Sequence, residues 1–244
     1  MTAALTLGTL GTVWLGAFLG ALAAGGAGFA FALAASSIWL HALDPLHTTA
    51  FVVASGTLLH CGFVWQMRRS IKPRRLWPFL VGGLIGIPIG VQLLAHSDSA
   101  ALKVTLGAFL VIYGLYALVA PRLPYIGRGG QAADAAIGFA GGILGGLGGY
   151  SGVLPTIWTQ LRGWPKETAR SVYQPYILVA QVTTLILVGA IAFDRPTALL
   201  FASTIPALLL GAWVGWHIYG RLDDRRFRQV LAALLVASGL TLVL

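Results

Sequence analysis

Long apolar stretches separated by short polar loops occupy almost the whole chain. They cover residues 5–40, 48–66, 76–95, 101–120, 132–161, 171–192, 196–219 and 228–244. Most of them match or exceed the length of about 20 residues that an α-helix needs to cross a bilayer. They are continuously apolar, whereas the strands of a membrane barrel alternate over about ten residues. The pattern therefore predicts an all-α polytopic membrane protein.

The composition excludes several other classes of protein. Only 9% of the 244 residues are charged and 57% are hydrophobic, whereas soluble domains carry about 25% charged residues. A soluble enzyme, a disordered chain and a nucleic-acid binder are therefore excluded. The expected surroundings are membrane lipid, and the net charge of +9 is explained by basic residues retained on the cytoplasmic side. The single cysteine, Cys61, allows no internal disulfide.

Two halves of the chain share a glycine pattern, which predicts an internal duplication. An offset of 122 residues relates the glycines of the first segment to those of the fifth, and an offset of 125 relates later ones. We therefore expect one repeat over residues 1–120, a cytoplasmic linker over 121–131 and a second repeat over 132–244. Duplicated halves are common in secondary transporters. The matched pairs are Gly16 and Gly138, Gly20 and Gly142, Gly26 and Gly148, Gly86 and Gly211, Gly90 and Gly215, and Gly114 and Gly239.

The first segment of each half is too long for one ordinary span and is interrupted by glycine. Residues 5–40 contain the sequence AGGAG at 24–28, and residues 132–161 contain GGLGG at 145–149. Glycine tolerates backbone conformations that break a helix. Each segment is therefore expected to form a glycine-broken helical hairpin that doubles back. The sequence leaves open whether a hairpin is re-entrant or spans the membrane as two short helices.

The distribution of Lys and Arg favours the hairpins over single crossings. If each long segment crossed once, the 16 basic residues would divide equally between the two sides. If each doubles back, 14 of them share one side and only Lys103 and Arg195 lie on the other. Cytoplasmic loops carry an excess of Lys and Arg. This count predicts two inverted repeats in the cell membrane (inner or plasma), with basic loops in the cytoplasm and both termini outside.

The segment GFAGGILGGLGGYSGVLP at residues 138–155 resembles the signature of the sulfite exporter TauE/SafE family, a glycine ladder followed by an apolar stretch and proline. Tyr150 departs from the pattern at a position where glycine is frequent, and the first half lacks the proline. The resemblance implies a secondary transporter, often an exporter, of small anions such as sulfite, sulfoacetate and other sulfur oxoanions or organosulfonates. An anion channel, and a membrane enzyme or assembly partner without transport, are the alternatives.

The glycine breaks are the first candidates for a binding site, because a broken helix exposes unpaired N–H groups and a positive dipole end. Close helix packing through small residues is the competing interpretation. Polar residues inside apolar segments are the second group, since such residues are costly in lipid. No metal site, cofactor or catalytic group is expected, and all seven Asp and Glu residues fall in loops or at segment ends. The candidate substrate-binding residues are Gly25, Gly26, Gly28, His60, Gly148, Gly149, Tyr150, Ser151, Gly152, Gln174 and Gln181. Weaker candidates are Ser36, Ser37, Thr156 and Thr159.

Overall fold

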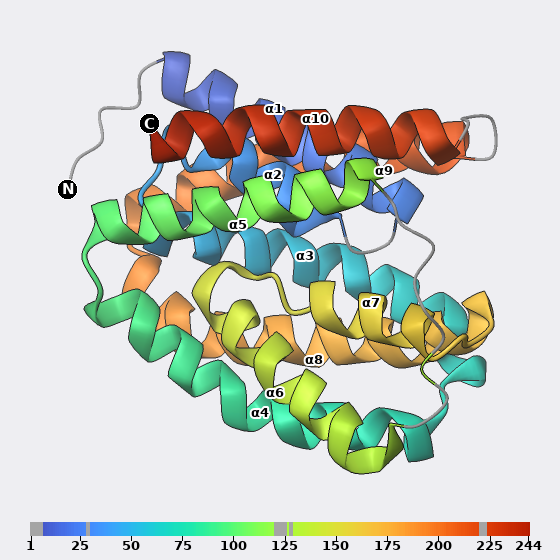
Figure 1. Cartoon of the computed structure of the whole chain (residues 1–244). Helices are drawn as coiled ribbons and strands as arrows, with labels where there is room; N and C mark the ends of the chain where they lie inside the picture. The colour runs from blue at the N-terminus through green and yellow to red at the C-terminus, as the bar shows by residue number, and fades with distance from the viewer. Residues whose placement is uncertain (1–6, 28–29, 120–125, 127–128, 220–223) are drawn as a thin grey trace. The chain divides into compact units, whose positions relative to one another are not determined.

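The structure, a computed structural model, describes residues 7–27, 30–119, 126, 129–219 and 224–244. Within these residues the chain forms ten α-helices and a short 3-10 helix, without a β-strand (Figure 1). This confirms the all-helical prediction. The elements are α1 (Leu7–Ala27), α2 (Phe31–Trp39), α3 (Pro45–Met67), η1 (Arg68–Ser70), α4 (Pro73–His96), α5 (Ser99–Val119), α6 (Gly130–Gly148), α7 (Val153–Leu161), α8 (Lys166–Ala192), α9 (Arg195–Tyr219) and α10 (Asp224–Val243).

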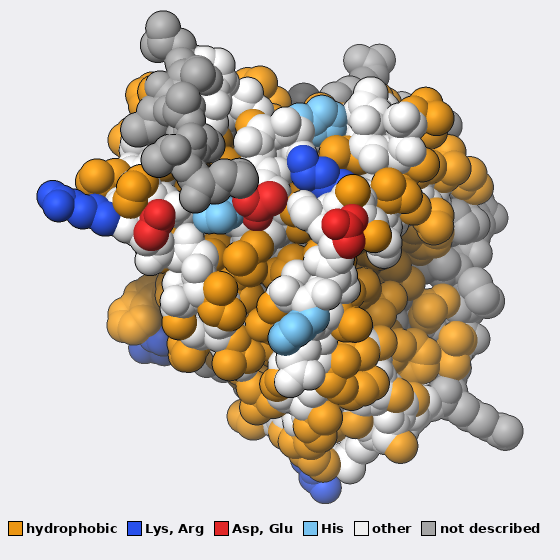
Figure 2. All heavy atoms as spheres, turned by 90° about the vertical axis from the view of Figure 1, so that its left-hand side faces the viewer, with side chains coloured by type: hydrophobic (Ala, Val, Ile, Leu, Met, Phe, Trp, Pro, Cys, Tyr) orange, Lys and Arg blue, Asp and Glu red, His pale blue; other side chains and the backbone are white. Residues whose placement is uncertain are grey.

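Five of the described helices are long and apolar enough to cross a membrane, namely α3, α4, α5, α8 and α9. Hydrophobic side chains are spread over much of the face seen in Figure 2, and charged side chains are few there. Internal prolines do not end these helices, and α8 runs unbroken through Pro175. Pro175 therefore does not interrupt α8 beside Gln174. Proline is tolerated in membrane helices because neighbouring groups satisfy the freed backbone.

Two short helices each fold back on the long helix before them. The indole Nε1 of Trp39 in α2 donates a 2.9 Å hydrogen bond to the carbonyl of Val13 in α1. In the same way, Trp158 Nε1 in α7 donates to Asp134 Oδ1 in α6 at 2.7 Å. The nine residues of α7 extend over about 14 Å at 1.5 Å per residue, about half of a 30 Å hydrocarbon core. The short helix α7 therefore cannot cross a bilayer.

The helices divide into two compact units. The first unit contains α1, α2, the start of α3, α5, α9 and α10, and the second contains the rest of α3, α4, α6, α7 and α8. Each unit therefore combines a hairpin from one half of the sequence with helices from the other half.

In the second unit, α4 and α6 pack with backbone against backbone (Figure 1). A Cβ atom on Gly146 of α6 would lie 2.5 Å from the carbonyl oxygen of Ile87 and 2.6 Å from the amide nitrogen of Val91, both in α4. Only glycine permits such an approach along the whole contact. The other glycines in which a Cβ atom would collide with the facing backbone are Gly82, Gly86 and Gly90 in α4 and Gly138 and Gly142 in α6.

In the first unit, α9 and α1 also pack closely through glycine residues. A Cβ atom on Gly215 would lie 2.6 Å from the carbonyl oxygen of Leu22, and one on Gly211 would collide with the carbonyl of Phe18. Helices α5 and α10 also meet through glycine, because a Cβ atom on Gly239 would lie 2.6 Å from the carbonyl oxygen of Gly107.

Candidate anion site at a helix break

The break between α6 and α7 is built around Gly149. Its φ of +77° is left-handed, and its N–H donates to the carbonyl of Gly145 at 2.8 Å, as in common glycine caps of helix C-termini. A Cβ atom at this position would also collide with Val52 Cγ1 of α3. Both the backbone conformation and the close neighbour therefore require glycine. The predicted break is confirmed here, and α6 ends at Gly148.

Helix α7 begins directly after the break with Gly152 as its N-cap, and no side chain caps it. The first turn of a helix carries the positive end of its dipole. In α7 the N–H of Val153 donates to the carbonyl of Tyr150 at 3.2 Å and the N–H of Thr156 to that of Gly152 at 3.1 Å, so the dipole is what this turn offers an anion. Pro155 lacks an N–H and suits this first turn. The start of α7 can therefore attract an anion without a nearby lysine or arginine.

Two hydroxyl groups in this region lack partners. Ser151 Oγ and Thr156 Oγ1 are buried, with 0% and 3% of the residues exposed, and neither has a hydrogen-bond partner among the described residues. A buried polar group without a partner costs about 1–3 kcal/mol. A bound oxoanion would accept a hydrogen bond from each hydroxyl and remove that cost. Thr156 was the weaker prediction, because threonine often bonds its own helix.

The other threonine of α7 shows that alternative. Thr159 is also fully buried, but its hydroxyl donates to the carbonyl of Thr156 at 3.0 Å. In the first unit, Ser36 Oγ donates to the carbonyl of Ala32 at 2.5 Å and Ser37 Oγ to that of Ala34 at 2.8 Å. These three weaker candidates therefore bond their own helices.

The polar residues predicted in α3 and α8 lie in the same unit as this break. His60 is buried, and its Nδ1 lies 2.8 Å from the carbonyl oxygen of Gly56, one turn earlier in α3. The carboxamide of Gln181 lies against Gly56, since a Cβ atom there would be 2.6 Å from Oε1. Gln174 is buried in α8. The carboxamide of Gln181 therefore lies beside Gly56, which is one turn of α3 away from His60.

The remaining predicted residues give a mixed picture. Tyr150 is buried at the break, and its ring occupies space that a Cβ atom on Gly148 would need. Gly25 and Gly26 belong to the last turn of α1, so helix α1 continues through part of the first predicted break. Gly28 lies outside the described residues. The roles of Gly25, Gly26 and Gly28 in substrate binding therefore stay predictions.

Sequence reasoning missed a polar contact that closes the α6–α7 hairpin at its open end. Asp134 is 6% exposed, and its Oδ1 accepts from Trp158 Nε1 and, at 3.2 Å, from Arg162. The Arg162 guanidinium also lies 5.6 Å from the ring centre of Trp164, over which Arg75 stacks at 4.9 Å. The tryptophan near the end of each short helix was the one sequence signal that could have indicated this contact.

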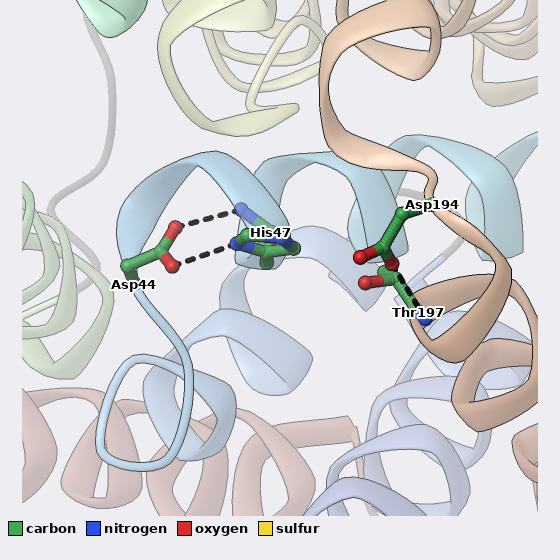
Figure 3. A network of polar contacts seen from close by, with 4 residues as sticks. All are labelled: Asp44, His47, Asp194 and Thr197. Carbon is green, nitrogen blue, oxygen red and sulfur yellow. Dashed lines mark hydrogen bonds and ion pairs between the residues drawn. The ribbon is translucent and has the colours of Figure 1, made fainter. Parts of the chain in front are cut away.

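A second polar cluster lies at the start of α3 and α9 in the first unit (Figure 3). Asp44 accepts from the backbone N–H of His47 at 3.0 Å and lies 2.7 Å from its Nδ1, and Asp194 accepts from the N–H of Thr197 at 2.9 Å. Burial raises the pKa of Asp44, but the hydrogen bonds from His47 lower it, and the net pKa lies below its ordinary value. These carboxylates act as helix caps. No group of three metal-binding side chains exists among the described residues.

Comparison with known proteins identifies the family. The family described as Sulfite exporter TauE/SafE matches residues 10–242, nearly the whole chain. Neither the curated proteins nor the solved structures contain a significant match. The chain therefore belongs to the sulfite exporter TauE/SafE family, whose members are membrane transporters of sulfite and related sulfur anions and not enzymes.

Proposed function

We propose that this protein is a secondary transporter that exports a small sulfur oxoanion or organosulfonate, such as sulfite or sulfoacetate, and binds it at the break between α6 and α7. The observation that carries the proposal is the pair of buried hydroxyls, Ser151 and Thr156, without partners among the described residues at the start of α7. Together with the positive end of the α7 dipole, these hydroxyl donors form a set that suits an anion. Sulfite and sulfonate groups present several acceptor oxygens and match such a set.

The charge of the anion is stabilised in this proposal by dipoles and hydroxyls. The described contacts of Arg75 and Arg162 place these residues at helix ends, with Trp164 and Asp134 as their partners. A helix N-terminus stabilises a negative charge by about 0.3–1 kcal/mol at the surface and up to about 2 kcal/mol when partly buried. A site of this strength binds the anion and still lets it leave.

We also propose that the two halves are inverted repeats. The packing of α4 on α6 supports this, since Gly86 and Gly90 face Phe139 and Ile143 in the way that Gly211 and Gly215 face Phe18 and Leu22. The facing residues Phe18 and Phe139 are 121 residues apart, one less than the offset found from the first glycines of each half. The short α7, which reaches only halfway across a bilayer, supports a re-entrant hairpin.

The topology can be tested with single cysteines in place of Arg74, Arg162 and Arg225, in a Cys61→Ala background because Cys61 is exposed. Inverted halves place all three positions in the cytoplasm, so impermeant thiol reagents should not label them in intact cells. Labelling of positions 162 and 225 with protection of position 74 would contradict the arrangement.

The binding site can be tested with Thr156→Val, which removes a hydroxyl at nearly constant volume. In proteoliposomes, the KM for sulfite or sulfoacetate should rise at least about tenfold, because a hydrogen bond to a charged group contributes about 1.5–3 kcal/mol. The ligand-free protein should become more stable, because the unpartnered buried hydroxyl is gone. Thr159→Val is the matched control, and its KM should not change.

A failure of Thr156→Val and Ser151→Ala to change KM would reject the site.

A channel, the second candidate, differs from a transporter in lacking counterflow. Unlabelled substrate on the far side should accelerate uptake of labelled substrate if the protein alternates its access, and should not do so if it is a channel.

A further inference from the structure

One face of α3 connects the helix break with Gln181. Val52 borders Gly149 at the break, and Gly56 and His60 follow at intervals of four residues, so the three lie on the same side of the helix. Ser55 belongs to this face as well, and its buried hydroxyl has no partner among the described residues. The face therefore carries polar groups away from the break toward the His60 end of α3.

Gln181 of α8 places a buried carboxamide against this face of α3. It is 2% exposed, and its Oε1 has no hydrogen-bond partner among the described residues. Its carboxamide fits because residue 56 is glycine, since a Cβ atom there would lie 2.6 Å from Oε1 and 2.7 Å from Cδ and would collide with Nε2. Buried carboxamides are almost always hydrogen-bonded in folded proteins. An apolar residue would fill this place without that cost, so the amide indicates a ligand.

The spacing along α3 limits what that ligand can be. Val52 and Gly56 are one helical turn apart, which is about 6 Å at 1.5 Å per residue. An anionic group at the break and a group bound to Gln181 are therefore separated by about one helical turn. The sulfite dianion carries only acceptor oxygens, so it cannot donate a hydrogen bond to Oε1. A two-carbon sulfonate with a terminal hydroxyl reaches both, and its hydroxyl can donate to Oε1 and accept from Nε2.

We propose that Gly56 and Gln181 form a specificity subsite that binds the second polar group of a two-carbon sulfonate, with Gly56 as the specificity-determining residue that leaves room for the carboxamide. The inference rests on the proposed function, because it assumes that the sulfonate group occupies the break between α6 and α7.

The test compares two probes of equal length in proteoliposomes. Isethionate carries a terminal hydroxyl, and 1-propanesulfonate carries a methyl group in its place. The wild-type protein should prefer isethionate about five- to tenfold in KM, the effect of one neutral hydrogen bond. Gln181→Leu should bring this ratio close to one and keep the transport of propanesulfonate. Gly56→Ala, which displaces the carboxamide, should also lower the ratio. Gly62→Ala is the control in the same helix, with no atom within 4 Å of the added methyl group, and should keep the preference.

The outcomes separate this inference from the proposed function. Transport of both probes with equal KM by the wild-type protein, or an unchanged preference in Gln181→Leu, would overturn the subsite and leave the binding of anions at the break intact. Absence of transport of sulfite and of both sulfonates would instead reject the proposed function. The rise in the unfolding midpoint of the wild-type protein with each probe measures the same preference without any variant. Equal stabilisation by isethionate and 1-propanesulfonate would also overturn the subsite.

Discussion

The contact between α4 and α6 makes a quantitative prediction for Gly146→Ala. The added methyl group would lie 2.5 Å from the carbonyl oxygen of Ile87 and 2.6 Å from the nitrogen of Val91. Both neighbours are backbone atoms of a helix, so neither can rotate away. The two helices must separate by at least about 0.5 Å to restore a 3.0 Å contact, which is a large change for close-packed elements.

Overpacking of this kind costs about 1–3 kcal/mol, and alanine regains only about 0.5–1 kcal/mol over glycine inside a helix. A net loss of about 1–2 kcal/mol lowers the unfolding midpoint of a protein of this size by about 2–8 °C. The shift can be measured in detergent by intrinsic fluorescence, since the chain has 8 tryptophans. Gly62→Ala, with open space around the methyl group, should be neutral or slightly stabilising.

The same measurement on Gly215→Ala tests the equivalence of the two units, because its methyl group would lie 2.6 Å from the carbonyl of Leu22. A midpoint for Gly146→Ala equal to that of Gly62→Ala would refute the argument, since it would mean that α4 and α6 do not touch through their backbones.

Three further outcomes are expected. Asp134→Leu should lower the free energy of unfolding by about 3 kcal/mol or more, because it leaves the half-buried Arg162 guanidinium and the indole N–H of Trp158 without their acceptor. Asp134→Asn keeps an acceptor oxygen and should be milder. Equal unfolding midpoints for the two variants would argue against the contact. Asp44→Ala should cost about 0.5–2 kcal/mol through the lost helix cap. The pKa of Asp44 is lowered in the folded state and that of His47 is raised by its hydrogen bond to Asp44. The difference should therefore be largest between the ordinary pKa values of about 4 for the carboxyl and about 6.5 for histidine. It should shrink as pH falls through the lowered pKa of Asp44 or rises through the raised pKa of His47, which unfolding midpoints between about pH 3 and 8 would reveal. Flux of a fully ionised sulfonate should follow a potential set with potassium and valinomycin at equal pH, with about 2.3 kcal/mol per charge for 100 mV, and flux that follows only a pH gradient would establish proton coupling instead.

The helices were predictable from sequence because lipid requires continuous apolar stretches. Residues 76–95 became α4 (Pro73–His96), and 196–219 became α9 (Arg195–Tyr219). The break at Gly149 was also predictable, since clustered glycines weaken a helix inside a segment that is already too long for a single span. These features depend on local composition, which a single sequence contains.

The features that the sequence did not predict depend on contacts between residues that are distant along the chain. The role of Gly56 comes from Gln181, which lies 125 residues further along the chain. A single glycine in a membrane helix gives no sign of such a partner. Asp134 looked like a residue at a segment end, and its burial follows from the tryptophan and arginine that α7 brings back to it. Thr156 and Thr159 are both threonines of one short helix, and only the structure shows which hydroxyl stays without a partner.

Each compact unit contains helices from both halves of the sequence. This arrangement sets the order in which the two units can assemble during synthesis. Helix α6 begins at Gly130, only 34 residues after α4 ends at His96, and at about 5–20 residues per second its glycine face is translated within seconds. Helix α1 ends at Ala27 and must wait 168 residues for α9 at Arg195, which corresponds to about 8–34 s at the same rate. The unit that contains the N-terminal helix is therefore the last to be completed. During that interval the surface of α1 that will receive Gly211 and Gly215 faces lipid or the insertion machinery, and a ribosome that stops before α9 leaves the protein with a finished second unit and an open first one.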